Sequence, residues 1–309
     1  MTHPLEAFDP PIGVAQTLAY DVRRIVAPNP SPMTYRGTNT YLVGTTDLAV
    51  IDPGPDHPSH LAAILGAVQP GQQITHIVVT HSHIDHSPLA AALARQTQCP
   101  ILAFGDSGAG RSAAMQDLVD AGMTGGGEGI DPDFAPDQIV RDGARITGSD
   151  WQLEVIHTPG HLGNHIALAK QDVCFTGDHV MGWASSLVSP PDGDLTDFMT
   201  SCARLRARRW SQFLPGHGDV IDQPAARLDW LMSHRLSREA AILEALSVHP
   251  GTARTIAEQV YTETPPALLP AAERNVLAHL IDLKGKKQVE PMGSLRAETQ
   301  FRRTNPDAD

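Results

Sequence analysis

The stretch Thr80-His81-Ser82-His83-Ile84-Asp85-His86 decides how this chain is interpreted, because it places four metal-binding side chains within six residues. It follows the apolar run from Ile74 to Val79, which is short and rich in β-branched residues and therefore predicts a buried strand. In α/β proteins, the loops at the carboxyl ends of strands carry the chemistry. We therefore expect a metal site at the end of this strand.

Three further positions repeat the same order of apolar run, glycine and polar side chain. They are His161 after Gly160, Asp178 after Gly177 and His217 after Gly216. Together with the first stretch, they complete a set of candidate metal ligands that strand ends would deliver. The seven candidates are His81, His83, Asp85, His86, His161, Asp178 and His217.

The spacing of the first four ligands favours two ions rather than one, because no single strand or helix face can gather all of them. The expected sets are His81, His83 and His161 on one ion, Asp85, His86 and His217 on the other, and Asp178 on both. Two ions that share a water lower its pKa from about 15.7 to about 7. We expect a metal-bridging hydroxide that attacks an ester, thioester, amide-like or phosphodiester bond, with Asp85 and Asp178 as catalytic carboxylates. Nitrogen and oxygen ligands suit zinc, manganese or iron, and zinc is our first expectation.

The composition sets limits on partners and location. Of the 309 residues, 41% are hydrophobic and 19% charged, which is typical of a globular protein, and the net charge of −12 argues against nonspecific attraction to nucleic acid or membranes. No apolar run approaches the ~20 residues of a membrane helix, and the first residues resemble no targeting signal. Cys99, Cys174 and Cys202 are widely spaced, as expected for reduced thiols. We therefore predict a cytoplasmic protein with no membrane partner.

The chain divides near residue 224, where the alternation of strands and helices stops. We predict a catalytic domain over 1–224, a winged-helix-like domain over 225–296 and a frayed polar tail over 297–309. Basic and acidic residues are equal in number from residue 225 onward, so the first domain carries the whole net charge. The glycines of 125–129 predict a mobile flap or a plain loop, and residues 182–194 predict a wall that faces the substrate.

The seven ligands resemble those of the metallo-β-lactamase superfamily, which has two histidines, an aspartate and a histidine followed by three single ligands. The resemblance covers roughly residues 30–223. It implies a four-layer αβ/βα sandwich with two mixed sheets, outer helices and a dinuclear site along one edge. The fold class expected here is therefore α/β, with a small C-terminal winged-helix-like domain.

Three features resemble the β-lactamase-like subgroup more narrowly: the run 37–43, the turn 51–54 and the C-terminal winged helix. That subgroup includes a mitochondrial single-strand endoribonuclease. The ribonuclease has a cysteine after the bridging aspartate, whereas this chain has His179, and the loop that follows through Trp183 and Pro191 also differs. Both differences argue against ribonuclease activity.

Five other residues are candidates for a supporting role at the metal site. Asp52, at the end of a strand, is expected to hydrogen-bond a ligand, and His165 either to reach the substrate or to orient a ligand. Asn39 and Asn164 are expected either to shape turns or to contact the substrate. His179 is expected either to point away from the metals or to support the site. The five are Asp52, Asn39, Asn164, His165 and His179.

Several functions remain open. The leading one is a metal-dependent hydrolase of a small-molecule or short polyanionic substrate. A single-strand endoribonuclease would need a basic path, for which the candidates are Arg204, Arg206, Arg208, Arg209, Lys284, Lys286 and Lys287. An iron-dependent oxidoreductase would hold one ion only. A regulator that binds DNA through the winged helix is disfavoured by that domain's neutral charge, so nucleic acid is not favoured as a partner and pairing of two chains is a further expectation.

Overall fold

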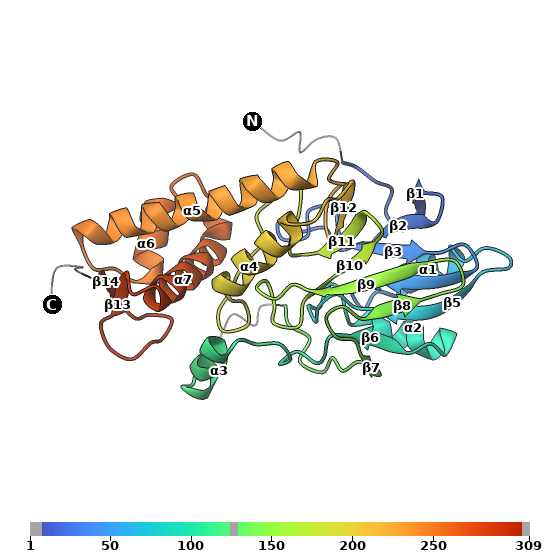
Figure 1. Cartoon of the computed structure of the whole chain (residues 1–309), viewed down its shortest axis with the longest axis horizontal. Helices are drawn as coiled ribbons and strands as arrows, with labels where there is room; N and C mark the ends of the chain where they lie inside the picture. The colour runs from blue at the N-terminus through green and yellow to red at the C-terminus, as the bar shows by residue number, and fades with distance from the viewer. Residues whose placement is uncertain (1–7, 124–128, 305–309) are drawn as a thin grey trace.

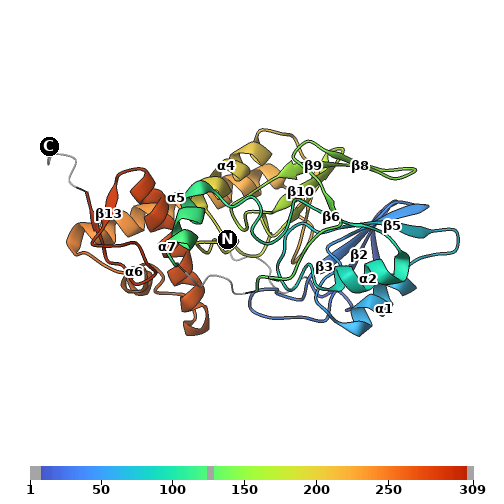
Figure 2. The same ribbon diagram turned by 90° about the horizontal axis from the view of Figure 1, so that it is seen from below.

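The computed structural model describes residues 8–123 and 129–304. Two β-sheets pack face to face, and helices cover both outer faces (Figure 1, Figure 2). This is the predicted four-layer αβ/βα arrangement, so the fold class is confirmed. In spatial order the first sheet contains β1 (Gln16–Ala19), β2 (Val22–Val26), β3 (Asn39–Val43), β4 (Asp47–Ile51), β5 (Gln73–Val78), β6 (Ile101–Ala103) and β7 (Gln138–Ile139).

The second sheet has five strands and, like the first, is mixed. β12 pairs with β11 in parallel, and the other neighbours are antiparallel. In spatial order its strands are β12 (Gln212–Pro215), β11 (Val173–Gly177), β10 (Ile166–Lys170), β9 (Gln152–His157) and β8 (Arg145–Thr147).

Three apolar layers hold the sandwich together. Residues such as Tyr41 and Phe175 alternate toward the space between the sheets, where their rings meet edge to face at 5.1 Å. The outer face of the first sheet packs on α1 (Pro58–Gly66) and α2 (Leu89–Thr97), and that of the second packs on α4 (Leu195–Arg206). A further short helix, α3 (Ala113–Asp120), lies outside these layers (Figure 1), and its Met115 and Leu118 pack against Ile281 and Leu295 of the C-terminal region.

The strands that carry the ligands all end at one edge of the sandwich. β5 is parallel to β4 in the first sheet, and β11 is parallel to β12 in the second. β9 is antiparallel to β10, which is itself antiparallel to β11, so β9 also ends on that side. Parallel strands end at the same edge of a sheet. The four ligand-bearing loops therefore meet there, although up to 136 residues separate His81 from His217.

The C-terminal region consists of α5 (Pro224–Val248), α6 (Ala253–Val260), a 3-10 turn (Pro266–Leu268), α7 (Leu269–Gly285) and the hairpin β13 (Val289–Pro291) with β14 (Phe301–Arg303). The predicted boundary falls at the start of α5, but this helix belongs to both cores. Leu228 and Leu231 pack against the second sheet and α4, whereas Ile242 and Leu246 pack against α6 and α7. The two domains therefore share one continuous helix (Figure 1).

One sequence expectation needs correction. The tail after residue 296 is not frayed up to residue 304, because β14 pairs with β13 and Phe301 is fully buried among α5, α6 and α7.

Most of the predicted glycine loop lies outside the described residues. Among the helices of 8–123 and 129–304, none is both long enough and apolar enough to cross a membrane.

Candidate metal centre

Four of the predicted ligands form a first group at the edge of the sandwich. Their ligand atoms lie within 4.8 Å of one another. His83 Nδ1 is 2.8 Å from His81 Nε2 and 3.1 Å from His161 Nε2, and Asp178 Oδ2 is 3.8 Å from His161 Nε2. The structure thus brings together residues from the β5, β9 and β11 loops, as the sequence analysis expected.

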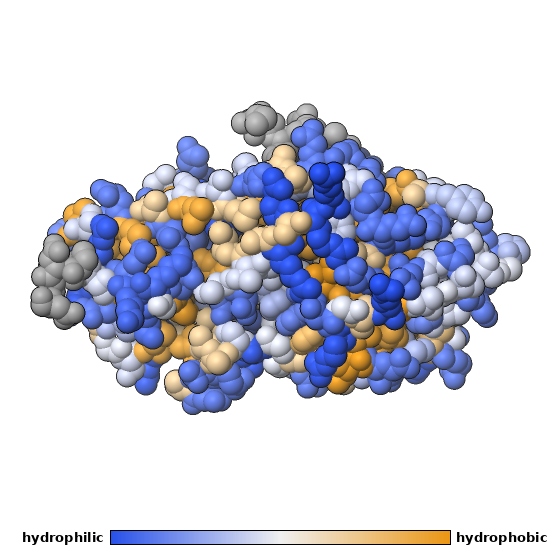
Figure 3. All heavy atoms as spheres, viewed as in Figure 1, coloured by the Kyte–Doolittle hydropathy of each residue, from blue (hydrophilic) through white to orange (hydrophobic). Residues whose placement is uncertain are grey.

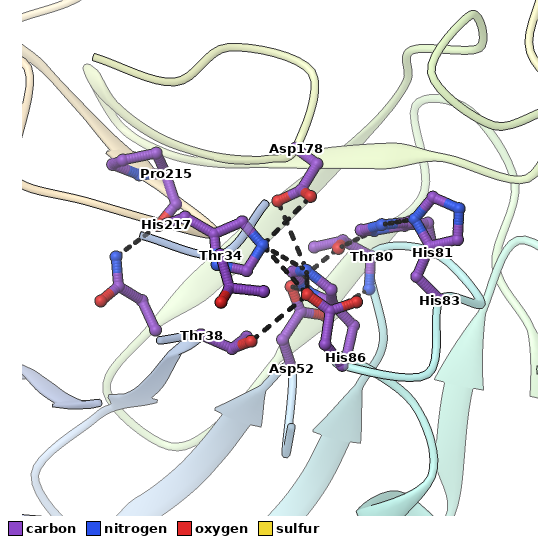
Figure 4. A network of polar contacts seen from close by, with 12 residues as sticks. Thr34, Thr38, Asp52, Thr80, His81, His83, His86, Asp178, Pro215 and His217 are labelled. Carbon is purple, nitrogen blue, oxygen red and sulfur yellow. Dashed lines mark hydrogen bonds and ion pairs between the residues drawn. The ribbon is translucent and has the colours of Figure 1, made fainter. Parts of the chain in front are cut away.

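The other ligands form a second group, which shares Asp178 with the first (Figure 4). His217 Nε2 lies 3.1 Å from Asp85 Oδ2, 3.2 Å from Asp178 Oδ2 and 3.3 Å from His86 Nε2. Figure 4 shows the carboxylate of Asp178 pointing toward His86 and His217 from the second sheet, while His86 rises from the first. One aspartate between two groups is the arrangement that a bridging ligand requires.

The residues fit a pair of divalent cations. Four ligands placed 2.0–2.1 Å from one ion in a tetrahedron would lie about 3.3–3.4 Å apart, and the contacts above are close to that separation. Several of these contacts join nitrogens of two different imidazole rings, and a neutral imidazole ring carries a proton on only one of its two nitrogens. Asp178 Oδ1 is buried without a well-aligned hydrogen bond from the described residues, and His86 Nε2 lies 3.3 Å from it. Such a concentration of lone pairs is stabilised by a cation.

Glycine precedes these ligands because there is no room for a side chain. A Cβ at Gly216 would come within 2.3 Å of Asp178 Oδ1, and one at Gly177, which has a φ of +47°, within 2.6 Å of His165 Nε2. The sequence pattern of glycine before ligand therefore has a steric cause.

Burial and charge set the protonation of the two groups differently. Burial lowers the pKa of His81 and His161 and lowers that of His83 to about 3, so the first group presents neutral nitrogens. Burial also acts on His217, but the Asp178 and Asp85 carboxylates outweigh it and raise the pKa of His217 to about 10. The second group therefore calls for positive charge, which a bound cation would supply in place of a proton.

In four of the ligand histidines, the ring nitrogen that faces away from the centre is held by a hydrogen bond. His86 Nδ1 lies 2.9 Å from Asp52 Oδ2, and His81 Nδ1 lies 3.0 Å from the hydroxyl of Thr80. His161 Nδ1 donates to the carbonyl of Leu187 at 2.7 Å, and His217 Nδ1 to that of Gly37 at 3.2 Å. Partners of this kind hold the ring and aim the other nitrogen at the ion.

Asp52 takes the position expected of it. It directly follows β4 in a left-handed conformation with a φ of +51°. Its carboxylate accepts hydrogen bonds from the Thr80 amide and hydroxyl at 2.7 Å each and from His86 Nδ1. The other four supporting residues are also fully buried, which leaves no surface for substrate contact.

The amides brace the ligand loops. Asn39 donates to the carbonyls of Pro215 and Gly218 on either side of His217, and Asn164 donates to the Ser82 hydroxyl between His81 and His83.

The remaining two histidines lie behind the centre. His165 Nδ1 is 2.8 Å from the Thr158 hydroxyl, and its ring centroid is 5.1 Å from that of His81. His179 points into the core, with Nε2 3.4 Å from Cys202 Sγ and its ring beside Phe198. His179 is therefore directed away from the metal centre, which is one of the two placements expected for it.

Sequence reasoning missed several residues that act on the ligands. Thr38 donates to Asp85 Oδ2 at 3.4 Å, and the Ser186 hydroxyl donates to the backbone carbonyl of Asp178. In the loop 182–194, for which a substrate-facing wall stays a prediction, Ser186, Val188 and Ser189 are buried, whereas Trp183 and Ser185 are partly exposed. The only signal in the sequence was Thr38 within the run 37–43. A contact to a backbone carbonyl cannot be predicted from residue types, because every residue has a carbonyl.

The fold and the site together define a metal-dependent hydrolase. Residues 33–216 match the metallo-beta-lactamase superfamily, and residues 252–294 match the beta-lactamase associated winged helix domain. The chain belongs to the metallo-beta-lactamase superfamily, and the membership and winged helix predicted from the sequence are confirmed.

Known proteins support this assignment over most of the chain. The chain is 30% identical over 292 residues to the beta-lactamase-like protein 2 homolog of Drosophila melanogaster, and the matched region covers 88% of this chain and 91% of the relative. It is 26% identical over 244 residues to an atrochrysone carboxyl ACP thioesterase of Cryptosporiopsis sp. (strain 8999), covering 77% of this chain and 66% of that protein. A beta-lactamase domain protein from Burkholderia ambifaria has the same fold, with a TM-score of 0.78 at 21% identity over 97% of this chain and 96% of that one.

Proposed function

We propose that this protein hydrolyses an acyl bond, an ester or a thioester, with two divalent cations in the two ligand groups. The observation that carries the proposal is the convergence of seven ligand side chains on one edge, with Asp178 common to both groups. Zinc is the first candidate for both positions, and manganese and iron suit the same ligands. When bound, such cations acidify water to a pKa of about 7 and polarise a carbonyl oxygen.

The chain's own residues provide the geometry. Asp178 ties the groups together, and burial keeps its environment dry. Its pKa is held well below the ordinary value because His217 and His86 outweigh the effect of burial, so Asp178 stays ionised at neutral pH. Asp85 has a side chain that is 21% exposed. An ionised oxygen at that open side can accept a hydrogen bond from the attacking water and orient it.

The surroundings of the site favour an acyl substrate over a polyanion. Three of the four arginines that were candidates for a basic path are each paired with a carboxylate on the outer face. The pairs are Arg204 with Asp142, Arg206 with Asp229 and Arg208 with Glu154. Lys286 is likewise paired, with Glu239 and Asp282. Figure 3 shows hydrophilic and apolar residues interspersed on the face that carries α4 and α5. Ile84, 52% exposed between His83 and Asp85, adds an apolar contact at the open side.

The name of one relative points the same way. One similar protein is a thioesterase by name, which supports thioesters as the first substrate class to test. The endoribonuclease and the DNA-binding regulator have less support because the three paired arginines and Lys286 already have carboxylate partners. The single-iron oxidoreductase has less support because both ligand groups are complete.

The decisive experiment is a hydrolysis screen with thioesters, esters, lactones, lactams, phosphodiesters and short RNA, using protein loaded with zinc or manganese. We expect thioester or ester turnover that Asp178→Ala abolishes, while its circular dichroism spectrum remains that of the wild type. The rate should change little with salt, whereas binding of a polyanion through 6–10 contacts weakens by about 10³–10⁵ between 50 and 200 mM salt. Cleavage of RNA alone, with that steep salt dependence, would refute the proposal.

A further inference from the structure

The loop between β11 and α4, residues 178–194, touches two metal ligands. The Leu187 carbonyl accepts the Nδ1–H of His161 at 2.7 Å, and the Ser186 hydroxyl donates to the Asp178 carbonyl at 2.5 Å. The described loop contains no helix or strand of its own. Apart from hydrogen bonds within the loop, its position therefore depends on the segments that contact it from outside, and any shift of Leu187 would turn the ring of His161.

The C-terminal helices make those contacts on both sides of Leu187. Arg235 of α5 donates to the Ser186 carbonyl, and the side-chain oxygen of Asn275 on α7 accepts the Val188 amide at 3.1 Å. Arg235 also donates to the same oxygen of Asn275 at 2.9 Å. The residues before and after Leu187 are thus joined to one Arg–Asn pair.

Further hydrogen bonds extend the contact along the loop. Arg227 of α5 donates to the carbonyls of Met181 and Ala184 at 2.6 Å each. Arg274 of α7 donates to the Ser189 hydroxyl at 2.9 Å. Three arginines from the C-terminal helices therefore hold a loop that belongs to the catalytic sandwich.

The burial of Arg235 shows what this arrangement demands. Its exposure is 2%, and it forms no ion pair with a described carboxylate. An unpaired buried charge is strongly unfavourable unless hydrogen bonds compensate it. The bonds that Arg235 makes go to Ser186 and Asn275, and its guanidinium lies 5.2 Å from the centre of the Phe198 ring. A core that needed only packing would be served by an apolar side chain here.

We infer that Arg235 and Asn275 are positioning residues of the metal centre, through which α5 and α7 set the orientation of His161 and the place of Asp178. The winged-helix region thereby determines how tightly the first ligand group holds its cation. This inference rests on the proposed two-cation site, but it concerns metal affinity and does not depend on which bond is hydrolysed.

The test compares two substitutions of Asn275. Asn275→Asp keeps an oxygen that accepts from both Arg235 and Val188, and Asn275→Leu removes it. Metal-free protein is titrated with Co²⁺ alone, and the visible spectrum and the two binding steps are recorded. We expect Asn275→Leu to weaken one step by about 10-fold, the lower end of the range for residues that orient ligands, and to change the spectrum. Asn275→Asp should keep the wild-type Co²⁺ affinity and spectrum, and Arg235→Met should show the same changes as Asn275→Leu.

The matched control is Arg238→Met on the same helix. Arg238 donates to the Val260 carbonyl at 3.0 Å and stacks on Tyr261, so it holds α6 rather than the loop. We expect this variant to lose stability to urea with Co²⁺ binding unchanged. The inference is overturned if folded Asn275→Leu and Arg235→Met bind Co²⁺ with wild-type affinity and spectrum, or if Arg238→Met weakens binding equally. Failure of the hydrolysis screen alone would leave these binding results to stand.

Discussion

Replacing Asp52 with asparagine should weaken metal binding although the two side chains have nearly the same shape. The carboxylate accepts three hydrogen bonds, from the Thr80 amide, the Thr80 hydroxyl and His86 Nδ1. Asparagine has one accepting oxygen. If that oxygen stays on the Thr80 amide, its NH₂ group faces His86 Nδ1, which must then accept. The ring proton moves to Nε2, the atom that lies 3.3 Å from His217 Nε2 and that a cation needs unprotonated.

The size of the effect follows from the hydrogen bond that is lost. A hydrogen bond to a charged group contributes about 1.5–3 kcal/mol, and residues that orient a ligand contribute about 10–100-fold in metal affinity. Both ranges include about 2 kcal/mol, which corresponds to about 30-fold. We therefore expect Asp52→Asn to bind zinc in the second ligand group about 30-fold more weakly than the wild type.

The assay is competition between metal-free protein and a chromophoric chelator at neutral pH. Asp131→Asn is the matched control, because Asp131 accepts from the Ser87 hydroxyl at 2.8 Å in the same region without contacting a ligand side chain. Asp131→Asn should bind zinc as the wild type does. Wild-type zinc affinity in folded Asp52→Asn would show that the Asp52–His86 contact does not orient the ligand.

Three other measurements check the structure. Phe301→Ala should lower the free energy of unfolding in urea by about 3–5 kcal/mol because the ring is fully buried. A change within about 0.5 kcal/mol would instead indicate that the tail is frayed. Burial lowers the pKa of His279 to about 3, so only the unfolded chain takes up this proton as the pH falls from about 6.5 toward 3, and stability falls with it. Compared with His279→Gln, the wild type should lose up to about 1.4 kcal/mol more per pH unit in urea unfolding; equal slopes would contradict the buried neutral ring. Zinc at about 100 times its Kd should stabilise metal-free protein by about 2.7 kcal/mol in thermal unfolding, and an absent shift would argue against a preformed site.

Elements with regular apolar patterns were predictable, and those that depend on distant partners were not. The run 74–79 is β5 almost residue for residue, because a short β-branched stretch has few alternatives. β2 contains Arg23 and Arg24 and gave no strand signal. Arg24 is tolerated in the sheet because Asp219, 195 residues away, pairs with it at 3.2 Å and Phe8 lies against its guanidinium.

The tail was misjudged for a related reason. Residues 297–309 are polar on average, and a single phenylalanine gives no periodic pattern. Only the folded domain supplies the pocket among α5, α6 and α7 that buries Phe301, and only there does β14 find β13 as its partner.

By itself, the sequence determined the ligand types and their grouping. Histidines and aspartates spaced by one or two residues after a strand, or placed singly after Gly177 and Gly216, are local features, and the chemistry of imidazole and carboxylate travels with the residue name. Tertiary structure alone decided what orients those ligands. The Leu187 carbonyl, the Arg235–Asn275 pair and the turn of Asp52 toward His86 act through backbone atoms or across distant segments. Every residue has a carbonyl, so the one that receives a ligand's proton is chosen only when the chain has folded around it.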